Sequence, residues 1–233
     1  MKILLTGSNG QLGSKISKRL KQNGCELIGI DIQDCTKNVH LDAYHQVDIT
    51  DENKVQNLFS KYNDLDCLIN NAGIGVFTPT LQRTVEEFKS VMEVNLLGTF
   101  LMCQAYIKSK KKNGRIVNIA SMYGHQSSDK RIYGSSGRNN SEVYSATKAG
   151  VISLTKYLAT NFADMGFVVN SVSPGGIFNS QANDFLENYK QKSPQSRLGE
   201  PEEIAEIISF LAVSAPVYLN GEDLLVDGGF TKW

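Results

Sequence analysis

The chain has 233 residues, 41% of them hydrophobic, and its 24 Lys and Arg side chains balance 24 Asp and Glu side chains. This length suits one α/β domain that buries its own core. Because the charges cancel, nucleic acid and anionic membrane surfaces are disfavoured as main partners, and a small molecule is expected instead. The chain enters a strand pattern directly after Met1 and Lys2, and no apolar run approaches the roughly 20 residues that cross a bilayer, so a cytoplasmic protein is predicted.

Short apolar runs alternate with longer amphipathic stretches along the whole chain. The expected strands cover residues 2–6, 26–31, 66–70, 115–120, 168–172 and 224–226. The expected helices cover residues 12–23, 51–62, 84–110, 143–164 and 201–213. This alternation is typical of βα units and predicts a Rossmann-type α/β fold, a doubly wound parallel sheet with helices on both faces, as a single domain over residues 1–233.

Two polar segments lie between these elements. Residues 134–141 read GSSGRNNS, which indicates a surface loop. Residues 174–198 carry Gly, Asn, Gln and Pro and are long for a connection in a compact domain, so they predict a loop that contacts substrate. Four cysteines lack the paired spacing of metal ligands, so we expect mostly buried, reduced thiols and no metal site. They are Cys25, Cys35, Cys67 and Cys103.

A glycine-rich loop, TGSNGQLG over residues 6–13, follows the first strand and opens the first helix. In that context glycines let backbone N–H groups approach a pyrophosphate at a helix N-terminus. The loop therefore predicts a dinucleotide site. Its residues are Gly7, Asn9, Gly10, Gln11, Leu12 and Gly13.

Asp31 closes the next strand, 18 residues past Gly13. An acidic side chain there binds both ribose hydroxyls and repels a 2′-phosphate, so NAD is favoured over NADP. The alternative is that Asp31 merely ends a strand. Asp48 and Ile49 are predicted to approach the adenine, although a plain strand-end aspartate explains Asp48 nearly as well.

Tyr144 and Lys148 are four residues apart in a predicted helix, and Ser121 precedes them at the end of a strand. Residues at this spacing share one helix face, where an ammonium favours the phenolate of a tyrosine whose ordinary pKa is about 10. A second pair, Tyr106 and Lys110, has the same spacing. It comes late in a helix, at the end remote from the carboxyl edge of the sheet, and is interpreted as structural.

At this point the sequence resembles the short-chain dehydrogenase/reductase family along essentially its whole length. Asn70-Asn71-Ala72-Gly73 is similar to the family's NNAG element, and Asn95 to its mid-helix asparagine. The catalytic core and the later landmarks also match: Ser121, Tyr144, Lys148, Pro174-Gly175, and Gly221 through Val226-Asp227-Gly228-Gly229.

The resemblance implies hydride transfer between a nicotinamide and a substrate carbon. Tyr144 would then move the hydroxyl proton, Lys148 lower the tyrosine pKa and hold the ribose, and Ser121 bind the reacting oxygen. Asn95 would orient a water, or simply tie a helix together. The cofactor residues implied in addition to the glycine-rich loop are Asn71, Ala72, Gly73, Tyr144, Lys148, Pro174, Gly175, Ile177 and Asn179.

An insert over residues 122–143 separates Ser121 from Tyr144 by 23 residues, about ten more than is usual in the family. Its Lys130, Arg131 or Arg138 is expected to grip an anionic group, unless the segment is only a solvated charged loop. The insert and the PGGIFNSQ stretch are similar to short-chain dehydrogenases of bacterial surface-sugar pathways, including those for nonulosonic acids and flagellin glycans. A polar, hydroxylated, anionic sugar is therefore the leading substrate prediction.

Two alternatives remain. The first is a 3-oxoacyl-thioester reductase that docks an acidic carrier protein on the basic residues of 108–115, although Asp31 disfavours the NADPH expected of such an enzyme. The second is a catalytically silent NAD-binding sensor or scaffold. The resemblance also implies a homodimer or homotetramer, formed by helices 84–110 and 143–164. Their apolar residues support this only weakly, because such stripes are more often core.

Overall fold

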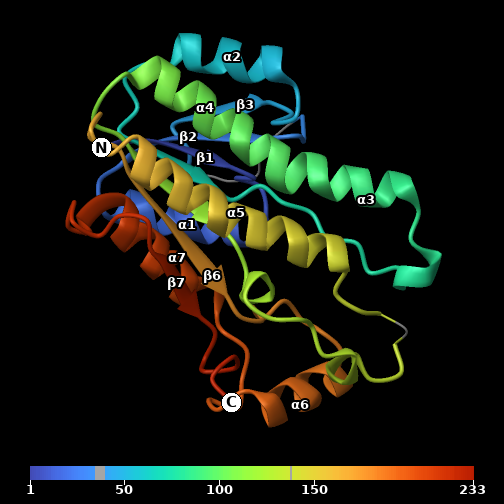
Figure 1. The fold of residues 1–233 in the computed structure, drawn as a ribbon. Coiled ribbons are helices and arrows are strands. Elements are labelled where there is room, and N and C mark those ends of the chain that lie inside the picture. The colour runs from blue at the N-terminus through green and yellow to red at the C-terminus, as the bar shows by residue number, and fades with distance from the viewer. Residues whose placement is uncertain (35–39, 137) are drawn as a thin grey trace.

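The computed structural model describes residues 1–34, 40–136 and 138–233, and the strands within them form one parallel sheet in the order β3-β2-β1-β4-β5-β6-β7 (Figure 1). Those strands are β1 (Lys2–Thr6), β2 (Glu26–Asp31), β3 (Ala43–Gln46), β4 (Cys67–Asn70), β5 (Arg115–Ile119), β6 (Val168–Pro174) and β7 (Asp223–Val226). The central strands are buried on both faces, as expected of a parallel sheet covered by helices on each side. The predicted Rossmann-type fold is therefore confirmed.

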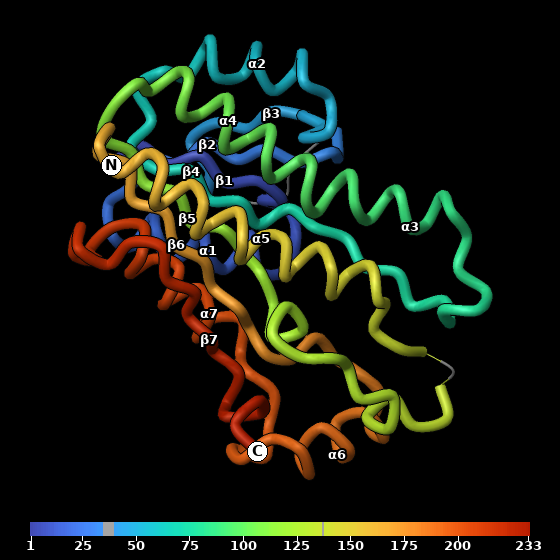
Figure 2. The backbone as a smooth tube through the Cα atoms, in the orientation of Figure 1, coloured from blue at the N-terminus to red at the C-terminus, as the bar shows by residue number. Residues whose placement is uncertain are grey.

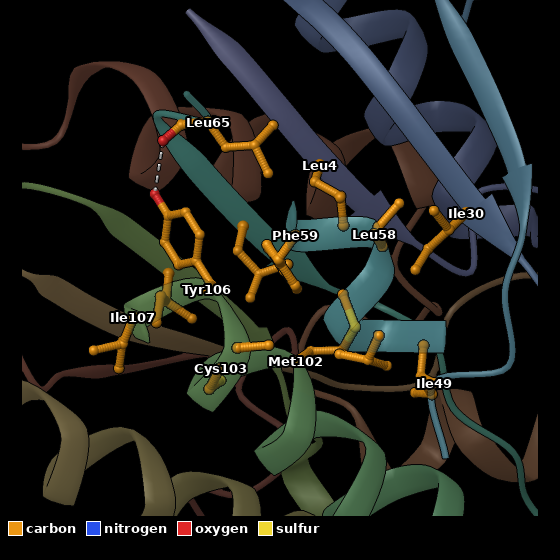
Figure 3. Close-up of a cluster of buried hydrophobic side chains, with 14 of the residues drawn as sticks. Leu4, Ile30, Ile49, Leu58, Phe59, Leu65, Met102, Cys103, Tyr106 and Ile107 are labelled. Atoms are coloured by element: carbon orange, nitrogen blue, oxygen red, sulfur yellow. Dashed lines mark hydrogen bonds between the residues drawn. The ribbon is translucent and has the colours of Figure 1, made fainter. Parts of the chain in front are cut away.

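Helices cover the two faces of the sheet (Figure 1). The α-helices of the described residues are α1 (Gln11–Gln22), α2 (Glu52–Lys61), α3 (Val85–Met92), α4 (Thr99–Lys110), α5 (Glu142–Asn161), α6 (Asn183–Lys192) and α7 (Pro201–Ser209), of which α6 lies away from the sheet. On one face α2, α4 and α5 pack over a large apolar cluster. On the other face α1 and α7 enclose a second cluster. Figure 3 shows part of the first, where Leu4 of β1, Phe59 of α2 and Met102 of α4 meet.

The connections leave β1 and β4 as neighbours at the centre, with the chain winding outward from them in opposite directions. Loops after these strands diverge, which opens a crevice at the carboxyl edge of the sheet, where open α/β folds bind their ligands. Every segment predicted to hold cofactor or substrate follows the carboxyl end of a strand.

A strand and an α-helix of the described residues were not predicted from the sequence. The first is β3, an edge strand that was not predicted, because its four residues AYHQ carry little apolar character and are only partly buried. The second is α6, which lies in the segment 174–198 that was expected to be irregular. Phe185 and Tyr189, one helical turn apart, line the inner side of α6, and Tyr189 is fully buried.

The predicted long helix over 84–110 contains a change of helical type. Its central turn, Glu93–Gly98, is a π-helix between α3 and α4. Such a turn inserts one residue into the hydrogen-bond ladder and is common at functional sites. A similar turn, Phe210–Ser214, follows α7.

The insert and α6 pack on each other away from the main sheet (Figure 2). They share a small apolar cluster whose buried members are Met122, Ile132, Tyr189, Leu198 and Phe230. A short 3₁₀ helix of the insert, Lys130–Tyr133, contacts α6, and Lys192 of α6 forms an ion pair with Asp129 at 2.8 Å. The two segments therefore form one wall beside the carboxyl edge of the sheet.

Cys25, Cys67 and Cys103 are buried free thiols, as predicted, whereas Cys35 lies outside the described residues. No helix in the described ranges is long and apolar enough to cross a membrane.

Candidate active site

Ser121, Tyr144 and Lys148 come together at the carboxyl end of β5. Ser121 is the second residue after β5, and Tyr144 and Lys148 lie in the first two turns of α5. The Ser121 hydroxyl is hydrogen-bonded to the Tyr144 phenol. The Lys148 ammonium donates to the Ile119 carbonyl at 2.7 Å and lies 5.6 Å from the centre of the Tyr144 ring. Three of the four predicted catalytic residues, Ser121, Tyr144 and Lys148, thus form one cluster.

Burial sets the charge of this cluster in the protein without cofactor. It raises the pKa of Tyr144, against the hydrogen bond from Ser121, which lowers it. Burial also lowers the pKa of Lys148 to about 8. The pKa of Tyr144 is therefore raised overall, contrary to the net lowering expected beside Lys148, because burial dominates. A cationic nicotinamide ring would supply the missing positive charge beside the phenol.

Asn95 lies in the π-helical turn and is 1% exposed. Its amide oxygen accepts from the Ile74 N–H at 2.8 Å, and its amide nitrogen donates to the Ile74 carbonyl at 2.9 Å. A further hydrogen bond reaches Thr147 at 3.3 Å. These contacts tie the NNAG segment to the helix, so Asn95 positions the backbone beside Lys148 rather than facing the open cavity.

The glycine-rich loop folds tightly against the NNAG segment. Gly7 has a φ of +63°, and a Cβ there would lie 2.8 Å from the Ala72 Cα. A Cβ on Gly13 would lie 2.2 Å from the Gly7 carbonyl oxygen. Asn71 holds the loop by donating to that same carbonyl at 3.0 Å.

The N-terminus of α1 has no side-chain cap, because Gly10 occupies the capping position. No side chain therefore caps the first N–H groups of α1, and Gln11 and Leu12 at this end of the helix line a cavity. An uncapped helix N-terminus approached by glycines fits a pyrophosphate. The residues present thus suit a dinucleotide, whose nicotinamide would exchange hydride with the substrate.

Asp31 ends β2 next to this loop. Its carboxylate accepts from the Asn9 N–H at 3.0 Å and from the Gln33 N–H at 3.3 Å. These contacts hold an acidic group at the place where the ribose of a dinucleotide would lie, which supports the preference for NAD.

Asp48 and Ile49, which were predicted to approach the adenine, make contacts within the protein. The Asp48 carboxylate accepts from the Thr50 N–H at 2.9 Å and from the Thr50 hydroxyl at 2.7 Å. Ile49 is 7% exposed and packs in the core, with Gly98 so close that a Cβ there would lie 2.7 Å from it. An adenine contact of these two residues stays a prediction.

A cavity of about 790 Å³ opens at the carboxyl edge of the sheet, a size typical of small-molecule sites. Of the residues predicted from the sequence, the cavity brings together Gln11, Leu12, Asn71, Gly73, Ser121, Tyr144, Lys148, Pro174, Gly175, Ile177 and Asn179. The remaining predicted residues do not line it: Gly7, Asn9, Gly10, Gly13, Asp31, Asp48, Ile49, Ala72 and Asn95.

The segment after β6 forms one side of the cavity. The Gly175 N–H donates to the Val226 carbonyl at 2.8 Å, and the Tyr189 hydroxyl accepts from the Gly176 N–H at 2.8 Å. Gln11 of the glycine-rich loop donates to the Phe178 carbonyl at 2.6 Å. The segment therefore spans from the cofactor loop to α6.

Several cavity residues escaped the sequence analysis. Tyr123 and Tyr133 of the insert, hydrogen-bonded to each other, line it together with Phe77 and Phe185. The unusual length of the insert was the available signal for Tyr133. Phe77 carries no signal beyond following the NNAG element.

The second tyrosine–lysine pair is structural, as predicted. Tyr106 is fully buried and donates to the Leu65 carbonyl at 3.3 Å (Figure 3). Lys110 lies at the surface, 3.8 Å from Asp66. Both are at the amino edge of the sheet, away from the cavity.

Comparison with known proteins identifies related reductases. A family model described as enoyl-(acyl carrier protein) reductase matches residues 8–231. A 3-oxoacyl-[acyl-carrier-protein] reductase from Synechocystis is 39% identical over 187 residues, which cover 77% of this chain and 70% of that protein.

Solved structures agree over nearly the whole chain. A short-chain dehydrogenase from Leptospira borgpetersenii with bound NAD⁺ is 41% identical, with a TM-score of 0.92 over 99% of this chain and 92% of that one. A proposed gluconate dehydrogenase from Agrobacterium tumefaciens is 26% identical, with a TM-score of 0.89 over 100% of this chain and 96% of that one.

The family match, the shared fold and the clustered serine, tyrosine and lysine agree in assigning an NAD(P)-dependent oxidoreductase that acts on carbonyl and hydroxyl groups. The chain belongs to the short-chain dehydrogenase/reductase family.

Proposed function

We propose that this enzyme uses NAD(H) to interconvert a ketone and a secondary alcohol, and that its substrate is a 3-oxoacyl thioester. The Ser121, Tyr144 and Lys148 cluster carries the reaction class. The substrate class is supported by the described activity of the Synechocystis relative. The aromatic groups of Tyr133 and Phe185, which line the cavity, offer an apolar surface for an acyl chain.

In the reductive direction the carbonyl oxygen would accept hydrogen bonds from Ser121 and Tyr144. As hydride reaches the carbonyl carbon, negative charge develops on that oxygen and Tyr144 donates its proton there. Lys148 stabilises the tyrosinate that remains, and general acid catalysis of this kind contributes roughly 10²–10⁴-fold.

The basic residues of 108–115 do not serve as a carrier-protein dock beside this site. Lys110 ends α4 and Arg115 begins β5, so both lie at the amino edge of the sheet. Arg115 donates to the Leu211 and Ala215 carbonyls, which gives it a structural role.

A polar, hydroxylated acid, such as an anionic sugar, is the second candidate substrate. Two observations favour it: Arg138, Asn140, Asn179 and Gln181 give the cavity many hydrogen-bonding groups, and one structural neighbour is described as a proposed gluconate dehydrogenase. A role in surface-glycan synthesis belongs to this candidate.

Following nicotinamide absorbance decides between the candidates. The wild-type enzyme and Tyr144→Phe are assayed with NAD(H) and NADP(H) against an acetoacetyl thioester, gluconate and neutral hexoses. Tyr144-dependent turnover of the thioester supports the first candidate, and turnover of gluconate alone supports the second. Cofactor binding with no Tyr144-dependent turnover on any compound would contradict the proposal and favour an NAD-binding sensor.

The proposed setting is the cytoplasm, in keeping with the buried free thiols at Cys25, Cys67 and Cys103.

A further inference from the structure

The insert carries three cationic residues, Lys130, Arg131 and Arg138, any of which could bind an anionic group according to the sequence. The structure shows which of them lies at the cavity. Arg131 is bound to Asp129, with its Nη2 2.7 Å from the carboxylate, and does not line the cavity. Lys130 also lies outside the cavity lining. Arg138 alone of the three lines it, together with Ser121 and Tyr144.

The Arg138 guanidinium is already oriented at the cavity wall. Its central carbon lies over the Phe77 ring, 4.1 Å from the ring centre, a cation–π contact that helps to hold the guanidinium in place. A Cβ built on Gly75 would lie 4.0 Å from the Phe77 ring and 3.8 Å from the Tyr144 ring. A single glycine therefore separates the aromatic platform of Arg138 from the catalytic tyrosine.

This guanidinium forms no ion pair with the part of the chain that the structure describes. Within the described ranges no carboxylate lies within 4.0 Å of it, in contrast to Arg83, Arg131 and Arg197. Asp184 also lines the cavity, but its carboxylate accepts from the Phe185 N–H at 2.9 Å. The other cation of the cavity, Lys148, is buried beneath the catalytic centre.

We propose that Arg138 is a specificity-determining residue that binds an anionic group of the substrate, a carboxylate or a phosphate, at the end remote from the reacting carbonyl. A planar guanidinium fixed on an aromatic ring presents paired N–H donors, which match such groups in bidentate geometry. This inference rests on the proposed function, because it names the part of the substrate that the cavity recognises.

Two kinds of substrate carry such an anionic group. One is a hydroxylated acid with its carboxylate, and the other is a thioester with the phosphate on its pantetheine arm. Matched probes distinguish them: gluconate against the neutral polyol glucitol, and acetoacetyl-4′-phosphopantetheine against acetoacetyl-pantetheine. Each pair differs in its anionic group and in little else.

Binding is measured by calorimetry on enzyme saturated with the cofactor form that cannot react with the probe: NADH for gluconate and glucitol, and NAD⁺ for the two acetoacetyl probes. The enzymes are wild type, Arg138→Gln, Arg138→Lys and the matched control Arg131→Gln. NADH affinity, measured first, verifies that each variant is folded.

One anionic probe should bind the wild type at least about tenfold more tightly than its neutral counterpart. Arg138→Gln should abolish that preference without changing the affinity for the neutral probe, Arg138→Lys should keep part of it, and Arg131→Gln should keep all of it. Equal binding of charged and neutral probes to the wild type would overturn the proposal. Equal behaviour of the Arg138 and Arg131 variants would overturn it as well.

The same experiment separates this inference from the proposed function. In Tyr144→Phe the Arg138-dependent preference should persist although turnover is lost. If no substrate is ever turned over while the preference remains, the proposed function fails and the anion site stands.

Discussion

Burial determines the pKa values of the Tyr144 and Lys148 side chains. Removing the lysine from water disfavours its charged form and lowers its pKa to about 8, while burial raises the pKa of the tyrosine. The protein without cofactor therefore holds both groups closer to their neutral forms than model compounds do. An oxidised nicotinamide held beside Tyr144 would add a positive charge, which favours the tyrosinate.

The lowered pKa of Lys148 has a consequence for stability. Between pH 8 and 10.5 the unfolded chain binds a proton at this lysine that the folded chain has lost, so the free energy of unfolding rises with pH across this window. Wild type should gain up to about 3 kcal/mol there relative to Lys148→Met. Denaturant unfolding at several pH values measures this gain.

Lys156→Met is the control for that series, since Lys156 is exposed on the same helix. A difference between wild type and Lys148→Met that stays flat from pH 8 to 10.5 would show that Lys148 is not desolvated as described.

Asp31 should set the choice between the two dinucleotides. Asp31→Ser removes the negative charge that repels a 2′-phosphate, so KM for NADP should fall and KM for NAD rise, each at least about tenfold. Steady-state kinetics with both cofactors measure the change. Asp34→Ser, an exposed neighbour, should leave both values unaltered. An unchanged preference in Asp31→Ser would mean that Asp31 only ends the strand.

At the scale of elements, the insert and α6 depend on each other. Arg131, and after it Lys192 of α6, hold the pKa of the Asp129 carboxyl well below its usual range. Beneath this ion pair Tyr189 stacks on Phe230 with ring centres 4.8 Å apart. The wall of the cavity is thus built from two segments far apart in the sequence.

Breaking the ion pair should loosen the wall without unfolding the domain, because exposed ion pairs contribute only about 0–1 kcal/mol. Lys192→Gln should speed amide hydrogen exchange in residues 183–192 and in the insert and should raise the substrate KM, with the overall melting temperature little changed. Hydrogen exchange followed by mass spectrometry measures this. Lys190→Gln removes only a pair within the helix, with Glu187, and equal exchange in both variants would refute the coupling.

Elements and residues differ in how far the sequence predicts them. The glycine-rich loop, Asp31 and Tyr144 were recognisable because their chemistry requires particular residues at fixed places along the chain. The helix α6 was missed, although Phe185 and Tyr189 have helical spacing, because Gly176 and Pro194 nearby indicate a loop. The selection of Arg138 over Arg131 depends on how the insert folds against α6, a long-range contact that no local pattern encodes.

At the scale of the whole molecule, the alternation of strands and helices predicted the parallel sheet and the edge at which ligands bind. The sequence predicts less well which parts of the outer surface form subunit contacts. On the two helices predicted to form subunit contacts, Val151 and Leu158 are core, whereas Leu97 and Phe100 are 43% and 39% exposed. Exposed apolar side chains on two adjacent helical segments support the predicted homodimer or homotetramer.

Light scattering at micromolar concentration should therefore give the mass of a dimer or tetramer of the 25.7 kDa chain. Phe100→Glu places a charge on the exposed apolar surface and should shift the mass toward the monomer, while Leu81→Glu, exposed elsewhere, should not. A monomeric wild type would reject the prediction.

The central claim is that Tyr144, and not the identically spaced Tyr106, moves the proton during hydride transfer. Turnover by Tyr144→Phe and Tyr106→Phe is compared on whichever compound the wild type converts, with NADH binding as the measure of folding. Tyr144→Phe should lower kcat by roughly 10²–10⁴-fold with NADH affinity kept. Tyr106→Phe should keep kcat and lose only about 1 kcal/mol of stability with its hydrogen bond to Leu65. Normal turnover by Tyr144→Phe would contradict the assignment of this active site.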